Sequence, residues 1–234
     1  MCFVLSLTNQ SMKKIVTQLL PFLLLITAVV PAFAQKKLAE GTILYDITIS
    51  SGSEKPQNAE FLDGATNAVY IKSGKVRTEM VSSLGTQSII IDQTSGQKAV
   101  VILKEYGSQK FMINLTAADW AELNKKHENV SFTFDAGETK TIQGFTAKKA
   151  IGKLSDGTSF TVWYSPDITV DNKDFQYANR TLPGLALEYE TNMGNLKVVY
   201  TVSKLSFAPV PAAKFDLPKT GFRVMTFQES KGGG

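Results

Sequence analysis

Hydrophobic and polar residues alternate along much of the chain after residue 40, and this period of two is typical of half-buried β-strands. In the segment 41–50, for example, mostly polar residues separate the apolar ones. Short turn sequences such as Ser73-Gly74 connect the alternating segments and predict antiparallel hairpins. The expected strands are 41–50, 66–72, 75–81, 87–92, 97–104, 130–135, 139–153 (broken at Gly144), 159–164, 185–191 and 196–205.

Two of the expected strands are apolar on both faces rather than on one. Their centres are the triplet Ile-Ile-Ile at 89–91 and the run Val-Val-Ile-Leu at 100–103. Both faces of the sheet are therefore expected to be covered at this point, either by the protein itself or by a bound apolar molecule. Cover by the protein itself is the favoured interpretation.

One segment has the features of a helix. Thr116 is a good N-cap residue, and Asp119 three positions later completes a pattern close to a capping box. Basic residues near the end suit the helix macrodipole, and the helix is expected to end near Asn129. The residues expected to share one face are Trp120, Leu123 and His127.

Many hairpin-connected strands and one main helix predict an α+β, mainly β domain with a curved antiparallel sheet or half-barrel. A closed barrel and a sandwich are the alternatives. The strands contain many Phe, Tyr and Met residues. These side chains fit either a packed core, which is favoured, or an apolar pocket on the concave side of the sheet.

The first 34 residues have the three parts of a secretory signal peptide. Lys13 and Lys14 supply the positive charge, the segment 15–30 is apolar, and the small-residue triplet 32–34 ends at Ala34. Cleavage is expected between Ala34 and Gln35. The alternative is a transmembrane anchor, but the apolar run is near the lower length limit for a span.

Met12 precedes the two lysines and resembles a natural start, so residues 1–11 are interpreted as an over-extended start of the reading frame. The remaining residues, 35–234, are expected to form a single mainly β domain that does not span the membrane. The protein is expected to be exported, to the periplasm, the outer membrane or the cell exterior.

Cysteine content and charge exclude several kinds of site. Cys2 is the sole cysteine and lies in the expected signal peptide, so the exported chain has no disulfide and no thiol nucleophile. Removal of residues 1–34 leaves 23 basic and 21 acidic residues, a formal charge of +2. This near-neutral charge without a basic stripe argues against a nucleic-acid partner.

The sequence offers few residues for catalysis. His127 is the sole histidine, and its two interpretations are a general base or, preferably, a residue that contacts the last helical carbonyl groups. Glu188 and Glu190 lie on one face of an expected strand, and a solvated face is favoured over a glycosidase pair. Acidic residues between 92 and 174 match no calcium-loop spacing. We therefore expect no enzyme activity, no metal and no cofactor.

Several strings resemble families of exported bacterial proteins. The string at 181–188, Thr-Leu-Pro-Gly-Leu-Ala-Leu-Glu, resembles the diagnostic motif of the GLPGLI family, with Thr181 and Ala186 as departures. Its matching residues are Leu182, Pro183, Gly184 and Leu185. The strings 41–45, 70–80, 142–150, 161–164 and 215–219 resemble a related domain-of-unknown-function family, in the expected order.

Both families are similar in outline to the periplasmic lipoprotein-carrier domains of the LolA/LolB type, which have a curved antiparallel sheet with helices over its concave side. The resemblance supplies no catalytic residues. In physical terms, Pro183 and Gly184 predict a tight turn that positions the following strand. This structural role is favoured over a binding role for the motif.

Two functions follow as expectations. The first is a non-enzymatic cell-envelope protein that binds a lipid, a lipidated protein or another apolar ligand in the concave face. The alternative is a periplasmic structural or protein-interaction module with a packed core and no ligand.

Overall fold

The computed structural model describes residues 35–49, 59–193 and 196–232. Contacts group Gln35–Gly234 into one compact unit. Residues 1–34 lie outside the described residues. They include the expected signal peptide, which ends at Ala34, and the proposed start at Met12.

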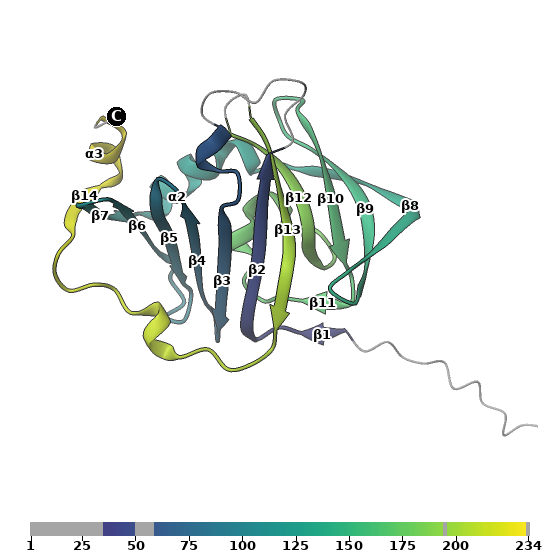
Figure 1. The fold of residues 1–234 in the computed structure, drawn as a ribbon, viewed down its shortest axis with the longest axis horizontal. Helices are drawn as coiled ribbons and strands as arrows, with labels where there is room; N and C mark the ends of the chain where they lie inside the picture. Colours follow the sequence, from purple (N-terminus) through teal and green to yellow (C-terminus); the bar gives the residue numbers. More distant parts are fainter. Residues whose placement is uncertain (1–34, 50–58, 194–195, 233–234) are drawn as a thin grey trace, which may run out of the picture. The chain divides into compact units, whose positions relative to one another are not determined.

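A single 12-stranded sheet forms most of the described chain (Figure 1). Its strand order is β14-β7-β6-β5-β4-β3-β2-β13-β12-β10-β9-β8, antiparallel except for the parallel pair β14 and β7. β14 and β8 are edges, so the curved sheet is open. The strands are β2 (Glu40–Ile49), β3 (Thr66–Lys72), β4 (Lys75–Ser82), β5 (Gly85–Asp92), β6 (Ala99–Tyr106), β7 (Gln109–Leu115), β8 (Ser131–Ile142), β9 (Phe145–Lys153), β10 (Ser159–Ser165), β12 (Leu185–Met193), β13 (Leu196–Ser206) and β14 (Arg223–Thr226).

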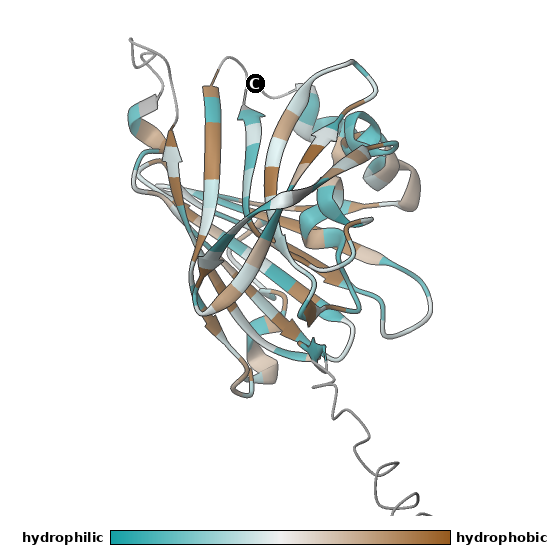
Figure 2. Ribbon diagram, turned by 90° about the vertical axis from the view of Figure 1, so that its right-hand side faces the viewer, coloured by the Kyte–Doolittle hydropathy of each residue, from teal (hydrophilic) through white to brown (hydrophobic). Residues whose placement is uncertain are grey.

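The expected α+β, mainly β architecture with a curved sheet is confirmed. Short helical segments and a parallel two-stranded pair accompany the large sheet. Figure 2 shows helical segments lying within the curve of the sheet. These elements are β1 (Lys36–Lys37), β11 (Ile168–Thr169), α2 (Ala117–Asn124), α3 (Phe227–Gly232), and the 3-10 segments η1 (Ala59–Phe61), η2 (Lys125–His127), η3 (Asp174–Asn179) and η4 (Ala212–Phe215).

The alternation in β2 defines the concave face of the sheet. Ile43, Tyr45 and Ile47 are buried on this face, as their spacing predicts. The doubly apolar strands β5 and β6 are covered on both sides by the protein. On the concave face the cover includes Trp120 and Phe227, and on the convex face it includes Met112 and Phe222.

The expected helix is shorter than predicted and exposes one residue that was expected to be buried. The capping box at Thr116 is confirmed, but α2 ends at Asn124 and continues only as the 3-10 turn η2. Leu123 is 43% exposed, whereas Asn124 is buried and its Nδ2 donates to the Trp120 carbonyl oxygen at 2.9 Å. Helical spacing shows which residues share one face of a helix, but it does not show where the sheet lies. It therefore grouped Leu123 with Trp120, although Leu123 faces away from the sheet.

The strand boundaries after residue 130 also differ from the expectation. The two expected segments 130–135 and 139–153 form β8 and β9, because β8 continues through residue 142 with a register shift between Phe134 and Thr139. The hairpin at Gly144 then connects β8 to β9, where Gln143 and Gly144 have positive φ.

Residues 207–222, the crossing segment, connect the central strand β13 to the edge strand β14 (Figure 1). The segment is bonded to the convex side of the sheet. The Val210 carbonyl oxygen accepts from Lys72 Nζ at 2.9 Å, and the Val210 N–H donates to Glu40 at 2.7 Å. Arg77 donates to the Lys214 carbonyl oxygen at 3.1 Å. The convex face is thus partly covered, while the concave face carries two cavities, of which the one lined by β3, β4, β5, β12 and β13 is called the main cavity for its central place in the sheet.

Candidate ligand-binding site

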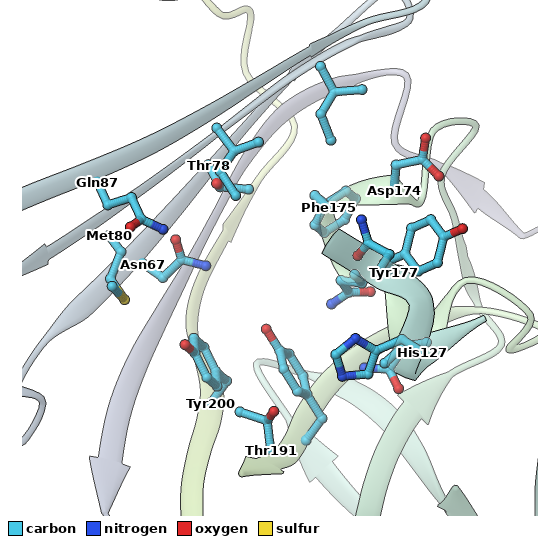
Figure 3. A pocket seen from close by; sticks show the side chains of 17 residues that line it. Asn67, Thr78, Met80, Gln87, His127, Asp174, Phe175, Tyr177, Thr191 and Tyr200 are labelled. Atoms are coloured by element: carbon cyan, nitrogen blue, oxygen red, sulfur yellow. The ribbon is translucent and has the colours of Figure 1, made fainter. Parts of the chain in front are cut away.

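A cavity of about 270 Å³ lies on the concave face, between the sheet and the short helical segments (Figure 3). Figure 3 shows Asn67, Met80 and Gln87 side by side on one wall and His127 on the other. The strands β3, β4, β5, β12 and β13 supply Asn67, Thr78, Met80, Gln87, Ile89, Ile91, Tyr189, Thr191 and Tyr200. The segments α2, η2 and η3 supply Asn124, His127 and residues 174–179.

Two tyrosines of the cavity wall, Tyr189 and Tyr200, and the buried Tyr45 that packs against them form an aromatic group at the site. The rings of Tyr189 and Tyr200 are stacked, with centroids 4.9 Å apart and planes 3° apart. Tyr45 packs edge-on against both rings, at 5.8 Å and 6.4 Å. Burial raises the pKa of each phenol above its ordinary value of 10.0, so all three are neutral at physiological pH. The cavity therefore has a rigid, uncharged aromatic side.

Gln176 holds η3 against this aromatic group. Its buried side-chain amide donates to the Tyr45 hydroxyl oxygen at 2.6 Å and to the Ala186 carbonyl oxygen at 2.9 Å. Tyr45 itself donates to the same carbonyl oxygen at 2.9 Å. The register of β10 and β12 shifts at this point, where Trp163 pairs with Glu188 but Tyr164 pairs with Ala186. At this bulge the Ala186 carbonyl oxygen is free to accept from the side chains of Tyr45 and Gln176.

One buried polar group in the wall has no partner. Asn179 is 3% exposed, and its Oδ1 forms no hydrogen bond with any described residue. An unpaired buried acceptor is costly, and a ligand donor would remove this cost. Asn179 lines both the main cavity and an adjoining cavity of about 50 Å³. It is thus positioned to accept a hydrogen bond from a donor that enters either cavity.

The wall of the main cavity carries little charge. Its acidic residue, Asp174, is paired with Lys98 at 2.5 Å and accepts from Gln93 at 2.9 Å. No Lys or Arg is among the described residues that line it. Amide, hydroxyl and aromatic groups therefore dominate, a composition that suits an amphipathic rather than a highly charged occupant.

His127 lies in the wall of both cavities, which helical spacing alone did not indicate. Burial lowers the pKa of His127 below its ordinary value of 6.5, the charges of Lys126 and Arg180 lower it further, and Asp156 opposes them. The imidazole is therefore neutral at neutral pH, with one nitrogen that donates and one that accepts.

We expect the stability of the protein to decrease on acidification, and His127 to be the cause. The folded-state pKa is lowered, so the unfolded chain takes up a proton first as the pH falls below about 6.5. The free energy of unfolding therefore decreases as the pH falls, and this decrease ends below the folded-state pKa. Because His127 is the sole histidine, His127→Gln should remove the pH dependence between about pH 7 and 5.5. Urea unfolding at several pH values measures this, and an unchanged slope in the variant would contradict it.

The motif residues 182–185 do not line the cavity. Leu182 and Leu185 are buried, Pro183 is exposed, and β12 begins at Leu185. Gly184 does not have a positive φ; its lack of a side chain instead permits close contact with the Ser165 backbone. Gly184 is thus required because a larger residue would clash with the Ser165 backbone, whereas the sequence predicted a glycine that forms a tight turn.

The carboxylates considered for chemistry are engaged separately. Glu188 pairs with Lys140 at 2.7 Å, and Glu190 pairs with Lys197 at 2.9 Å. No group of three His, Cys, Asp or Glu side chains in the described ranges could hold a metal ion. The residues that sequence reasoning missed are those of η3, because a short 3-10 segment has no periodic pattern.

No protein-family model matches the chain, and no curated protein matches it either. The GLPGLI resemblance therefore remains a prediction. Within the described residues, no helix has the length and apolar character needed to cross a membrane.

Solved structures that are similar to the chain include three at low identity. An uncharacterized conserved protein from Thermus thermophilus is 11% identical, with 93% of this chain and 99% of that chain covered and a TM-score of 0.48. MucB is 13% identical, with 80% and 60% covered and a TM-score of 0.39. The LolA superfamily protein NE2245 from Nitrosomonas europaea is 10% identical, with 78% and 91% covered and a TM-score of 0.32.

Proposed function

We propose that the protein is a non-enzymatic, exported protein of the cell envelope that binds an amphipathic ligand of the lipid class in its concave face. The observation that carries the proposal is the cavity of about 270 Å³, which has a stacked tyrosine pair and an unpaired buried acceptor. Ligand sites combine apolar walls with a few placed polar groups in this way. Export, and a location in the periplasm or at the outer membrane, are part of the proposal.

The dimensions of the cavity limit what fits inside it. Its volume is slightly below the range of about 300–1,000 Å³ that is usual for small-molecule sites. We therefore expect the cavity to hold part of a ligand, with the rest lying along the concave face. A lipidated protein could present its acyl chain to the same surface.

The proposal can be tested with a neutral single-chain amphiphile. Dodecyl maltoside below its micelle concentration should bind with a stoichiometry of one, as measured by native mass spectrometry and isothermal titration calorimetry. Thr78→Trp places a large side chain in the cavity and should weaken binding at least about tenfold. Thr86→Trp is the matched control, because it lies on the opposite face of the neighbouring strand β5.

Equal binding by both variants, or none by the unsubstituted protein, would contradict the proposal. Organic extraction of protein purified from its own envelope adds an independent test, because a co-purifying lipid would identify the ligand class.

The second candidate is a protein-interaction module, and one observation favours it. The edge strand β8 carries Phe134, which is 50% exposed and lies against Phe132 and Tyr164. Exposed edges with apolar side chains are sites for strand addition by a partner. If the protein is an interaction module, Phe134→Ser should abolish the capture of a partner protein. If it is instead an amphiphile-binding protein, the same substitution should leave amphiphile binding unchanged.

A further inference from the structure

A continuous row of cross-strand neighbours extends over the concave face beyond the main cavity. Arg223 on β14 pairs with Phe111 on β7, which pairs with Lys104 on β6. Lys104 pairs with Gln87 on β5, which pairs with Met80 on β4. Directly paired side chains share a face and have Cβ atoms about 4.5–5.5 Å apart. The row thus connects the main cavity, lined by Gln87 and Met80, to the edge of the sheet.

A second cavity lies at the other end of this row. It has a volume of about 670 Å³ and is formed by β6, β7, β14 and α3. Tyr106, Phe111, Ile113 and Met225 give it an apolar lining. Gln87 of the main cavity and Lys104 of the second cavity are paired directly, so the walls of the two cavities adjoin at this pair. Strands lie about 4.8 Å apart, and the row from β14 to β4 is therefore about 19 Å long.

The second cavity differs from the first in charge. Lys104 and Arg223 both line it, and neither forms an ion pair or a side-chain hydrogen bond within the described part of the chain. The carboxylate in its lining, Glu229, accepts from the N–H and the hydroxyl of Thr226, at 2.6 Å and 2.8 Å, and the nearby charge of Arg223 also acts on it. Most other lysines of the sheet have acidic partners, as Lys110 has Glu105 at 2.7 Å. Two cations without an ion pair and one hydrogen-bonded carboxylate thus lie beside an apolar surface, which leaves an excess of positive charge.

We propose that Lys104 and Arg223 bind the anionic head group of a single-chain amphiphile whose alkyl chain follows the row of paired residues into the main cavity. This inference rests on the proposed function and adds the charge and the direction of the ligand. An anion between the two side chains would receive charge-assisted hydrogen bonds, and Phe111 between them would contact the first carbons of the chain. The neutral wall of the main cavity then receives the distal part.

Matched dodecyl compounds test this inference by isothermal titration calorimetry on the purified protein. Dodecyl phosphate and laurate should bind more tightly than dodecyl maltoside, by about tenfold at low salt, and the difference should shrink as salt increases. The double substitution of Lys104→Gln with Arg223→Gln should remove this advantage and leave dodecyl maltoside binding unchanged. Comparison of phosphate and carboxylate head groups identifies which anion is preferred.

The control is a double substitution, Lys110→Gln with Lys219→Gln, which removes the same charge elsewhere. Lys110 neighbours Phe111 in β7 but points to the other face, and Lys219 lies in the crossing segment. An equal loss in the control would show a general charge effect and overturn the inference. So would equal binding of dodecyl phosphate and dodecyl maltoside, which would leave the proposed function intact.

Two further outcomes have distinct meanings. Binding of inorganic phosphate as tight as that of dodecyl phosphate would overturn the inference in favour of a site for the free anion. Failure of every dodecyl compound to bind the unsubstituted protein would overturn the proposed function together with the inference.

Discussion

Replacement of Gly184 by Ala is expected to lower the free energy of unfolding by about 3 kcal/mol, or to prevent folded protein from accumulating. A Cβ atom at this position would lie 2.0 Å from the Ser165 carbonyl oxygen and 2.6 Å from its carbon. The Cα of Pro166 would lie at 2.9 Å. All three are backbone atoms, so no side-chain rotation relieves the overlap. The start of β12 would have to move away from β10.

Chemical denaturation of the purified variant measures this effect. Gly137→Ala is the control, since the nearest atom to its added Cβ would be a side-chain oxygen of Asp135 at 3.6 Å. We expect the control to change stability by less than about 0.5 kcal/mol. If Gly184→Ala were as stable as the control, the close approach of β12 to the Ser165 backbone would be wrong.

Gln176→Ala is expected to cost about 2–3 kcal/mol of stability and to weaken amphiphile binding as well. The substitution removes two hydrogen bonds, to the Tyr45 hydroxyl and to the Ala186 carbonyl oxygen. It also leaves a void where a buried side chain now packs. Because η3 supplies six residues to the cavity wall, its loosening should enlarge and disorder the site.

Gln87→Ala is the matched control for this substitution. Gln87 lines the same cavity, but its side chain forms no hydrogen bond with a described residue. Its replacement should change stability by less than about 1 kcal/mol. Urea midpoints of the two variants compare them directly, and similar destabilisation would show that the bonds of Gln176 do not hold η3 in place.

The sequence predicted the elements that depend on local pattern. The alternation in β2 and β13, the hairpin at Ser73-Gly74 and the capping box at Thr116 all involve residues close together in sequence. Alternation also indicates which side chains face inward, because a strand has a strict period of two. The curved, mainly β fold follows from many such strands and one helix.

The candidate site could not be predicted in the same way. Strand order and register bring Lys104 and Arg223 into one row, although neither strand shows this by itself. The segment η3 is bonded to the centre of the sheet through Gln176, whose partner Tyr45 is 131 residues away in sequence. Inward-facing tyrosines were recognisable, but their stacking depends on the pairing of Tyr189 with Tyr200 across β12 and β13. Each of these features is a tertiary property.

The central position of β2 and β13 affects the order in which the chain can fold. β2 is the first long strand and β13 is nearly the last, yet they are neighbours in the middle of the sheet (Figure 1). Tyr45 and Ala186, which are hydrogen-bonded at this centre, are 141 residues apart in sequence. Contacts of such separation form slowly, since a large loop must close first. A chain that emerges N-terminus first would have to keep β2 unpaired on one side until β13 arrives, so β2 needs protection from other pairings while the chain folds.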